Sequence, residues 1–379
     1  MPGAGKTVNG AANGAADGAG GRPVLIMAGG TGGHVYPALA VAQWLRAGGW
    51  PLLWLGSRDG LEAQVASRHG FRLLPVRIRP LRGRGRGRRA LALLGAVAAL
   101  FHSLWYLLRY RPSVVLGAGG AASGPGGLAA WLLRIPLCIH EQNTVPGLSN
   151  RLLARIATVA MEAYPGSFPR RNAATATTGN PVRAEIWRAA AARRQQRRRD
   201  AAELRLLVLG GSQGARTLNL TLPPAVHQLA DRVRLIVRHQ TGPDMREETR
   251  ARYAELSGRV QLDAYIEDMA AAYGWADLAV CRAGALTLAE LAAMGLAAIL
   301  VPYPYAADDH QTSNASFFSR HGAAILLPEP ECTPERLSEL LLDLARHRQQ
   351  RLAMAERSRE LARPDATRAV AEICLNVRG

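Results

Sequence analysis

Short, almost uninterrupted apolar segments recur along the chain, and each is followed by a stretch with helical character. In the first half these segments lie at 24–28, 51–56, 71–78, 113–120, 136–142 and 157–163. They do not alternate apolar with polar residues, which is typical of strands buried on both faces of a parallel sheet. Because parallel strands need crossover connections, the pattern predicts an α/β fold built from βα repeats.

A strongly basic stretch at 193–200 interrupts this repeat, which then begins again. The apolar segments of the second half lie at 204–211, 233–242, 258–266, 276–284, 297–304 and 323–330. Two successive βα sets predict two Rossmann-like domains that face each other across a cleft. We expect an N-terminal domain at 22–182, a C-terminal domain at 183–363, and a last helix at 364–379 that packs back on the first domain.

The beginning of the chain differs from the rest. Residues 1–21 are rich in glycine and alanine and contain no apolar run, so they predict a disordered tail and no export signal. We therefore expect a protein of the cytosol. The four cysteines lie far apart and form no Cys-x-x-Cys pair, which argues against a zinc site or a disulfide framework. We expect all four to be buried and reduced.

The net charge of +18 is carried by arginine, because Lys6 is the only lysine. Such an excess implies a polyanionic partner. Nucleic acid is not expected, because no basic strand with interleaved aromatic residues and no known reading motif is present.

Seven arginines fall within 77–89, directly before an apolar segment at 90–108 that contains no acidic residue or arginine. The apolar segment just reaches the length of a transmembrane helix, but arginines flank both of its ends. A span would also separate the strands at 24–28 and 113–120, which should pair. We predict an interfacial helix on an anionic membrane surface. A buried core helix after a solvated loop is the alternative.

Three glycine-rich loops, at 29–33, 119–124 and 210–215, follow predicted strands. Backbone N–H groups without side chains in the way can approach a phosphate, and the N-terminus of a following helix favours negative charge. The first loop matches neither a Walker loop nor a dinucleotide fingerprint. A single loop is equally consistent with a tight turn. Three loops at the carboxyl ends of parallel strands predict one shared anion site.

Polar side chains accompany these loops. His34 ends the first loop, where a neutral imidazole could act as a general base near pH 7. Glu290 lies in a fourth strand-to-helix segment and could accept both hydroxyls of a ribose, although a carboxylate in a first helical turn also complements the helix dipole. Thr287 could cap the same helix. The segments at 140–143 and 308–314 add hydrogen-bonding groups of the kind that a sugar needs.

Neither an Asp-x-Asp motif nor a His/Cys cluster with metal-ligand spacing is present in the sequence. We therefore predict no metal and no other cofactor. Helix termini, Ser212 and Arg183 are expected to hold a pyrophosphate instead.

These motifs, in this order, resemble those of the MurG family, bacterial enzymes that make lipid II by glycosylating undecaprenyl-pyrophosphoryl-MurNAc-pentapeptide (lipid I). The resemblance spans about residues 24–370, and the matching segments are 27–42, 123–131, 140–143, 179–183, 210–216, 268–290 and 308–315. It implies a glycosyltransferase B fold, UDP-N-acetylglucosamine as donor, transfer to the C4 hydroxyl of lipid I, and inversion at the anomeric carbon. It also implies a peripheral protein on the cytoplasmic face of the bacterial inner membrane.

By position, the resemblance also implies the site residues. His34 becomes the candidate base for the acceptor hydroxyl, and Glu141 is the next candidate. The family usually has Tyr-Val where this chain has Ala121 and Ala122, which puts any acceptor contact of that tyrosine in question. The implied contacts with the donor are Thr31, Gly32, Gly33, Asn143, Arg183, Ser212, Ile266, Ala285, Leu286, Thr287, Leu288, Ala289, Glu290 and Gln311.

Two other classes of protein remain as alternatives. A UDP-sugar epimerase of similar two-lobed fold would share the donor loops, but it gives no reason for the arginine-rich segment. A non-catalytic nucleotide-sugar-binding membrane subunit should lack the loops of one domain, and this chain has the loops of both.

Overall fold

The computed structural model describes residues 21–77, 86–168, 174–195 and 203–378. The predicted disordered tail lies outside these residues except for Gly21, and so does most of the basic stretch at 193–200. The arginine-rich segment at 77–89 is described only at its two ends.

The N-terminal half forms a parallel sheet that has seven strands among the described residues, in the order β3-β2-β1-β4-β5-β6-β7. Their bounds are β1 Val24–Met27, β2 Leu52–Gly56, β3 Arg72–Pro75, β4 Val114–Gly117, β5 Leu137–Glu141, β6 Val159–Glu162 and β7 Ala174–Thr177. In this register Ile26 of β1 lies opposite Trp54 of β2 and Leu116 of β4. The predicted pairing of the first and fourth strands is confirmed.

The C-terminal half forms a second parallel sheet with six strands in the part of the chain that is described, in the order β10-β9-β8-β11-β12-β13. Their bounds are β8 Glu203–Leu209, β9 Arg234–Gln240, β10 Val260–Asp263, β11 Leu278–Cys281, β12 Ala297–Leu300 and β13 Ile325–Leu326. Each predicted apolar segment contains one strand, usually shorter than the segment because the strand ends before the turn residues that follow it.

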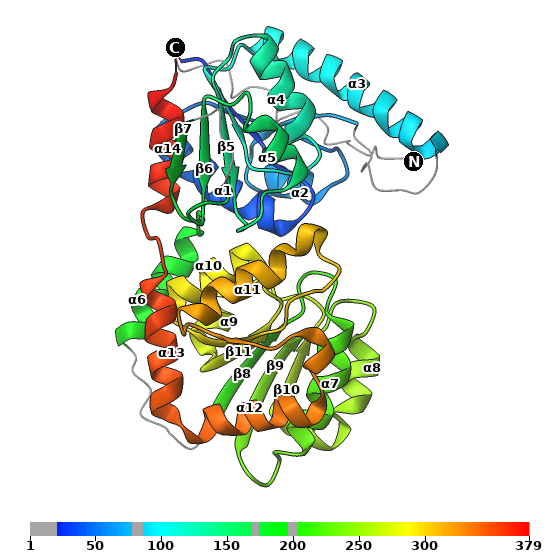
Figure 1. The fold of residues 1–379 in the computed structure, drawn as a ribbon, viewed down its shortest axis with the longest axis vertical. Coiled ribbons are helices and arrows are strands. Elements are labelled where there is room, and N and C mark those ends of the chain that lie inside the picture. The colour runs from blue at the N-terminus through cyan, green and yellow to red at the C-terminus, as the bar shows by residue number, and fades with distance from the viewer. Residues whose placement is uncertain (1–20, 78–85, 169–173, 196–202, 379) are drawn as a thin grey trace, which may run out of the picture.

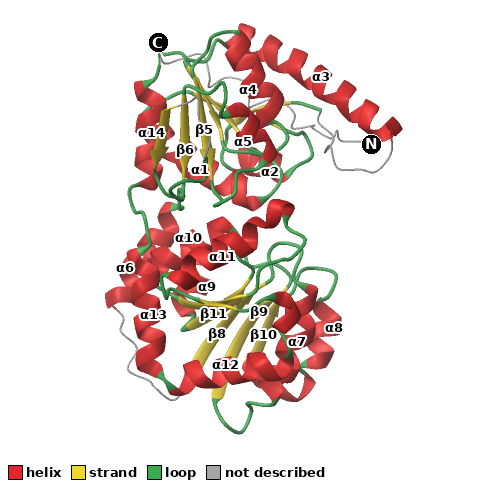
Figure 2. Ribbon diagram, in the orientation of Figure 1, coloured by secondary structure: helices red, strands yellow, loops and turns green. Residues whose placement is uncertain are grey.

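Helices cover both faces of each sheet (Figures 1 and 2). In the N-terminal half they are α1 Gly32–Ala47, α2 Leu61–Arg68, α3 Arg86–Tyr110, α4 Ser123–Leu132 and α5 Leu148–Leu153. The remaining helices are α6 Ala184–Gln195, α7 Arg216–His227, α8 Arg246–Arg252, α9 Met269–Trp275, α10 Ala285–Met294, α11 His310–Arg320, α12 Pro334–Arg346, α13 Arg348–Glu360 and α14 Ala366–Asn376. Short 3₁₀ helices lie at Ala254–Arg259, Ala307–Asp309 and Glu329–Glu331.

Successive residues of β1 face opposite layers of helices. Leu25 and Met27 pack in the cluster beneath α3 and α4, whereas Val24 and Ile26 pack in the clusters on the α1 side. Both faces of this strand are therefore buried, which explains the unbroken apolar segments. The four cysteines are free and buried, as predicted.

The chain passes between the two domains twice, once between β7 and α6 and once between α13 and α14. α6 packs on the C-terminal domain through Ile186 and Ala190. α14 packs on the N-terminal domain, where Val370 and Cys374 share a cluster with Val24 of β1 (Figure 1). The last helix thus closes on the domain in which the chain begins.

Strand β7 was not predicted from the sequence. Its residues alternate alanine with threonine, it lies at the edge of its sheet, and none of its residues is buried. A strand that buries so little carries no apolar signal, so only its pairing with β6 identifies it.

Candidate functional site

The first two glycine loops contact each other at the carboxyl ends of β1 and β4. A β-carbon on Gly120 would lie 2.3 Å from the carbonyl oxygen of Gly29, and Gly120 has a φ of +89°. Gly30 has a φ of +90°. Only glycine tolerates this combination of positive φ and close approach. The prediction that glycine loops converge at this edge of the sheet is confirmed for the loops of this domain.

A buried carboxylate that sequence analysis missed holds the first loop. Glu62 of α2 accepts a hydrogen bond from the N–H of Gly30 at 3.2 Å, and its other oxygen accepts from the N–H of Ser57 at 2.9 Å and the hydroxyl of Ser57 at 2.6 Å. Glu62 lies 32 residues from Gly30. No local motif marks it, because only the pairing of β1 with β2 brings α2 to the loop.

His34 lies in the first turn of α1, and its ring stands against Gly119 of the second loop. A β-carbon on Gly119 would lie 2.8 Å from Cδ2 of His34. The ring Nδ1 lies 3.3 Å from the carbonyl oxygen of Gly29. In the neutral ring, a proton on Nδ1 would donate to this carbonyl and leave Nε2 as the acceptor.

The charge state of His34 depends on both domains. Burial lowers the pKa of His34, and His310 of the C-terminal domain lowers it further. The carboxylate of Glu141 and the hydrogen bond to Gly29 act in the opposite direction. Since burial dominates, the imidazole is neutral at pH 7, as a general base must be.

Glu141, the second candidate base, is buried at the end of β5, and both of its oxygens are occupied. One oxygen accepts from the backbone N–H and the side-chain amide of Asn143, each at 3.0 Å. The other accepts from the N–H of Gly147 at 3.1 Å and from the amide of Asn150 at 2.9 Å. Four donors order the loop after β5 around a single carboxylate.

The neighbouring residues of this loop do not offer polar groups to a ligand as expected. His140 and Gln142 are buried, with Nε2 of His140 3.0 Å from the carbonyl oxygen of Gly179. The side-chain amide of Gln142 donates to the carbonyl of Ala118 at 3.0 Å, and the backbone carbonyl of Gln142 accepts from the side-chain amide of Asn180 at 2.9 Å. These side chains brace the loop from behind.

In the C-terminal domain, α10 begins directly after the loop that follows β11. Its N-cap is Gly284, so Thr287 is not the cap that the sequence suggested. The N–H of Leu288 already donates to the carbonyl of Gly284 at 3.0 Å. The first turn, Ala285 to Thr287, therefore carries the N–H groups that an anion could reach. The side chain of Leu288 is fully buried in the domain core, so it faces away from any ligand.

Arg183 forms an ion pair with Glu290, which lies in the second turn of α10. Nη2 of Arg183 lies 2.9 Å from Oε1 of Glu290, and the two side chains are 12% and 5% exposed. The hydroxyl of Tyr273 donates to Oε2 of Glu290 at 3.0 Å. Burial raises the pKa of Glu290, and the guanidinium and the tyrosine hydroxyl partly offset this effect. Nε of Arg183 is buried and has no hydrogen-bond partner among the described residues.

The third glycine loop lies across from α10. Ser212 is exposed on this loop. The side chain of Gln240 connects the loop to the next expected contact: it donates to the carbonyl of Gly211 at 2.7 Å and accepts from the N–H of Ile266 at 3.1 Å. The Ile266 side chain is buried, so a ligand would meet this residue through its backbone.

The segment after β12 makes hydrogen bonds within its own domain and with the N-terminal domain. Gln311 accepts a hydrogen bond from the N–H of Tyr303 at 2.9 Å. Asn314 is fully buried and bonded to Asn143 and Thr144 of the other domain. Asn314 therefore does not present its amide to a sugar, contrary to expectation.

Tyrosines from the two domains meet beside the site. The hydroxyls of Tyr36 and Tyr265 lie 3.1 Å apart. The guanidinium of Arg183 stacks over the Tyr36 ring at 4.8 Å. The first turns of α1 therefore reach the residues that hold Glu290. Thr31 is the N-cap of α1, and Gly32 and Gly33 are the first two residues of this helix.

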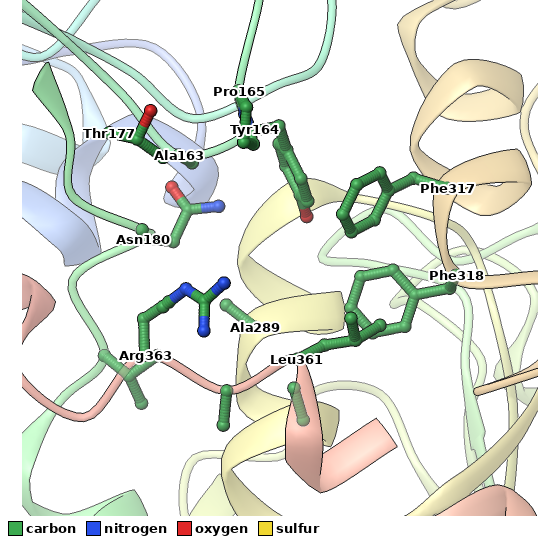
Figure 3. Close-up of a pocket in the computed structure, with 14 residues that line it drawn as sticks. Ala163, Tyr164, Pro165, Thr177, Asn180, Ala289, Phe317, Phe318, Leu361 and Arg363 are labelled. Carbon is green, nitrogen blue, oxygen red and sulfur yellow. The ribbon is translucent and has the colours of Figure 1, made fainter. Parts of the chain in front are cut away.

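An apolar contact joins the two domains. Figure 3 shows Tyr164 and Phe317 facing each other beside a cavity of about 50 Å³ that Leu361 and Arg363 also line. The two rings lie 4.9 Å apart at an interplanar angle of 67°. Ala289, an expected donor contact, lies in the middle of α10 and lines this cavity.

Within the described ranges, no three His, Cys, Asp or Glu side chains are grouped so that they could hold a metal ion.

An apolar surface is exposed along α3, α4 and α5, and we refer to it as the α3–α5 surface. On α3, Phe101 is 66% exposed and Leu108 is 60% exposed, whereas Leu107 packs in the domain core. The helix thus has one face on the domain and one face in solvent, and the alternative of a buried core helix is wrong. The large apolar side chains of the surface are Leu94, Val97, Phe101, Trp105, Leu108, Leu128, Trp131, Leu132, Leu148 and Leu152.

None of the helices found in the described residues has both the length and the apolar character needed to cross a membrane.

Comparison with known proteins places the whole arrangement in one family. A family model described as the glycosyltransferase family 28 N-terminal domain matches residues 24–162, and the model of the C-terminal domain of the same family matches residues 205–370. The crystal structure of Acinetobacter baumannii MurG matches with a TM-score of 0.78 at 40% identity, covering 94% of this chain and 100% of that one. Two domains of parallel sheets in the glycosyltransferase B fold are therefore confirmed.

Two relatives carry the name UDP-N-acetylglucosamine–N-acetylmuramyl-(pentapeptide) pyrophosphoryl-undecaprenol N-acetylglucosamine transferase. The protein of Alkalilimnicola ehrlichii is 51% identical over 353 residues, which cover 93% of this chain and 98% of the relative. The protein of Nitrosococcus oceani is 49% identical over 354 residues, with the same two coverages of 93% and 98%.

A UDP-GlcNAc 2-epimerase from Neisseria meningitidis, solved bound to UDP-GlcNAc, has a TM-score of 0.66 at 13% identity and covers 93% of this chain and 100% of its own. At that identity the two proteins share the fold alone. The sequence matches over both domains thus decide between the two classes, and this chain belongs to the MurG family of glycosyltransferase family 28, the UDP-N-acetylglucosamine–N-acetylmuramyl-(pentapeptide) pyrophosphoryl-undecaprenol N-acetylglucosamine transferases.

Proposed function

We propose that this protein transfers N-acetylglucosamine from UDP-N-acetylglucosamine to the C4 hydroxyl of lipid I, with inversion, to form lipid II. The observation that carries the proposal is the placement of its half-sites on facing domains. His34 lies at the loops of the N-terminal domain, and the first turn of α10 with Arg183 and Glu290 lies in the C-terminal domain. Direct transfer requires both half-sites at once.

The C-terminal half-site suits a nucleoside diphosphate. The N–H groups at the start of α10 and the positive end of its dipole favour the diphosphate. Nε of Arg183, which is buried without a partner among the residues that the structure describes, can donate to a phosphate oxygen. Glu290 can accept from both ribose hydroxyls once its pairing with Arg183 is released. Thr31, Gly32, Gly33, Asn143, Ser212, Ile266 and Gln311 complete the proposed donor contacts.

His34 is the proposed base. Its Nε2 takes the proton from the C4 hydroxyl as the oxygen attacks the anomeric carbon from the face opposite UDP. The bond between that carbon and the phosphate oxygen breaks, and UDP leaves with the electron pair. The dipole of α10 and Arg183 stabilise the charge that develops on the phosphate.

Glu141 supports this base through its charge. Its four hydrogen bonds with the loop after β5 and with Asn150 of α5 fix the carboxylate in place. Its charge favours the imidazolium that forms when His34 accepts the proton. We therefore assign Glu141 an electrostatic part in catalysis.

The α3–α5 surface is the proposed site of membrane attachment. Exposed arginines adjoin its apolar side chains in sequence: Arg109 follows Leu108, and Arg151 lies between Leu148 and Leu152. Basic residues beside an anionic leaflet contribute about 1 kcal/mol each. An apolar face with flanking arginines thus favours peripheral binding to anionic lipid. Lipid I resides in the membrane, so we place the enzyme on the cytoplasmic face of the inner membrane, where UDP-sugars are available.

The test of the reaction is UDP release from UDP-N-acetylglucosamine by the purified protein, with and without a lipid I analogue. The proposal predicts release only with the acceptor. An epimerase would instead convert the sugar nucleotide with no acceptor present, and a non-catalytic binding subunit would do neither. Either of those results would remove the proposed function.

A further inference from the structure

Asn314 of α11 makes a buried hydrogen-bonded connection between the two domains. Its carbonyl oxygen accepts from the N–H and the hydroxyl of Thr144, each at 3.0 Å. Its amide donates to the side-chain carbonyl of Asn143 at 3.1 Å and to the backbone carbonyl of Ala283 at 3.2 Å. The side chain is 0% exposed. All the groups of this amide are engaged, so its role is not to bind a sugar.

The partners of Asn314 lie at the two half-sites. On one side, Asn143 donates to Glu141 through its backbone N–H and its amide, each at 3.0 Å, and Glu141 acts electrostatically on His34. On the other side, Ala283 immediately precedes Gly284, the N-cap of α10. One side chain thus connects the loop that surrounds Glu141 with the start of the helix proposed to face the diphosphate.

The same face of α11 makes the apolar contact between the domains. Phe317 lies one turn after Asn314, and its ring packs against Tyr164 at 4.9 Å (Figure 3). Other polar contacts between the domains are more accessible: in the ion pair of Arg151 with Asp308, at 3.4 Å, the side chains are 49% and 51% exposed. Exposed pairs of this kind contribute little, whereas a buried amide with every group satisfied specifies a single geometry.

We propose that Asn314 is a positioning residue for transfer: with Thr144 it fixes the arrangement of the domains in which the base faces the donor. The expected effect of Asn314 on turnover rests on the proposed function. The domain arrangement itself can be measured without any substrate.

Three variants separate the parts of this connection. Asn314→Ala removes all of it. Asn314→Asp keeps the acceptor for Thr144 but places a carboxylate oxygen opposite the carbonyls of Asn143 and Ala283. Thr144→Val removes the hydroxyl donor and leaves the contact with Ala283 intact. The control is Ser338→Ala. Ser338 lies in α12, far from the contact between the domains (Figure 1), and its buried hydroxyl donates to the side chain of Gln228 at 2.7 Å.

Each variant is compared with the unaltered chain in three ways: turnover with a lipid I analogue at saturating donor, the dissociation constant for UDP by calorimetry, and the radius of gyration in solution by X-ray scattering. We expect Asn314→Ala to lower kcat by about 10- to 100-fold, since misplacement by about 1 Å costs up to that factor. The UDP dissociation constant should stay within about threefold, because the groups proposed to hold the diphosphate and the ribose, at the start of α10 and at Arg183 and Glu290, all lie in the C-terminal domain. The radius of gyration should rise.

Thr144→Val should lower kcat by a smaller factor. A variant with both Asn314→Ala and Thr144→Val should have the same kcat as Asn314→Ala alone, because both changes break one connection. Ser338→Ala should leave kcat and scattering unchanged. The inference is overturned if Asn314→Ala keeps kcat within twofold and the same radius of gyration, or if Thr144→Val and Asn314→Ala reduce kcat independently. Absence of transfer by the unaltered chain would instead count against the proposed function.

Discussion

Nη2 of Arg183 lies 2.9 Å from Oε1 of Glu290, so the cation expected to meet the diphosphate and the carboxylate expected to meet the ribose are paired with each other. The pair keeps both charges satisfied in a nearly buried place. A donor that bridges them must separate them, and its own phosphate and hydroxyls then replace what each side chain loses. Part of the intrinsic binding energy of the donor is therefore spent on opening this pair.

Replacing Glu290 should have two effects. Glu290→Ala removes the ribose acceptor and leaves Arg183 and Tyr273 without a buried partner. We expect a donor KM about 10- to 100-fold higher, from a charged hydrogen bond of about 1.5–3 kcal/mol, and a loss of about 3–5 kcal/mol in unfolding free energy. Glu290→Gln keeps an acceptor for Tyr273 and should lose less stability. A donor KM that does not change in either variant would remove Glu290 from the site.

His34→Ala should lower kcat by about 10²–10⁴-fold, the usual cost of losing a general base. UDP binding should be nearly unchanged, because the base does not contact the nucleotide. Since burial lowers the pKa of His34, the acidic limb of the kcat/KM profile of the unaltered chain, which reports the free enzyme, should lie below pH 6.5, with activity falling as the imidazole gains its proton. The variant should lose that limb. Turnover within a fewfold of the unaltered chain, with the limb retained, would assign His34 a structural role.

A second histidine tests the assignment of that limb. His310 lowers the pKa of His34 from across the domain boundary, while Glu141 and the carbonyl of Gly29 raise it. His310→Gln removes the lowering effect, so the acidic limb of the kcat/KM profile should move to higher pH. A limb that stays in place, or moves to lower pH, would mean that another group titrates there.

Gly119→Ala should disturb the base through packing alone. Gly119 has a φ of +98°, and a β-carbon there would lie 2.8 Å from the His34 ring. Gly49→Ala is the matched control, because Gly49 has a φ of +82° and no atom within 4 Å of an added β-carbon. Backbone strain of about 1 kcal/mol should lower the stability of both variants. Only Gly119→Ala should lower kcat, by at least tenfold. Equal activities of the two variants would contradict the contact between Gly119 and His34.

Membrane binding should depend on the apolar side chains of the α3–α5 surface. Burying one large apolar side chain contributes about 1.5–3 kcal/mol, so Phe101→Ser with Trp105→Ser should weaken binding to anionic vesicles by at least about 100-fold. The control is Leu352→Ser, an exposed leucine on α13 of the other domain. Sedimentation with vesicles of anionic and of neutral lipid separates the electrostatic contribution to binding from the apolar contribution. Unchanged partition of the double variant would exclude this surface as the attachment site.

The sequence predicted the fold because both faces of the central strands of each sheet are buried. Segments such as Val24–Met27 and Leu278–Cys281 are apolar throughout and are followed by glycine turns, which leaves few alternatives to a parallel sheet. The edge strand Ala174–Thr177 escaped prediction because it consists of alanine and threonine and has no large apolar side chain.

Candidate site residues were predictable where a loop motif carries them, as for His34 and Glu290. They were not predictable where tertiary packing carries them. Glu62 holds the first glycine loop from a helix that no motif marks. Asn314 occurs within a recognisable segment, but its role depends on how the two domains meet, and no local pattern records that.

The most direct test of the proposed function follows the labelled sugar. Purified protein is incubated with UDP-N-acetylglucosamine labelled in the sugar, together with a lipid I analogue, and the lipid product is isolated and its glycosidic linkage determined. We predict that the label moves to the lipid in a one-to-one ratio with UDP released, in a β linkage to the C4 hydroxyl of the MurNAc residue. Label that remains in a sugar nucleotide or appears as free sugar, with none in the lipid, would contradict the account.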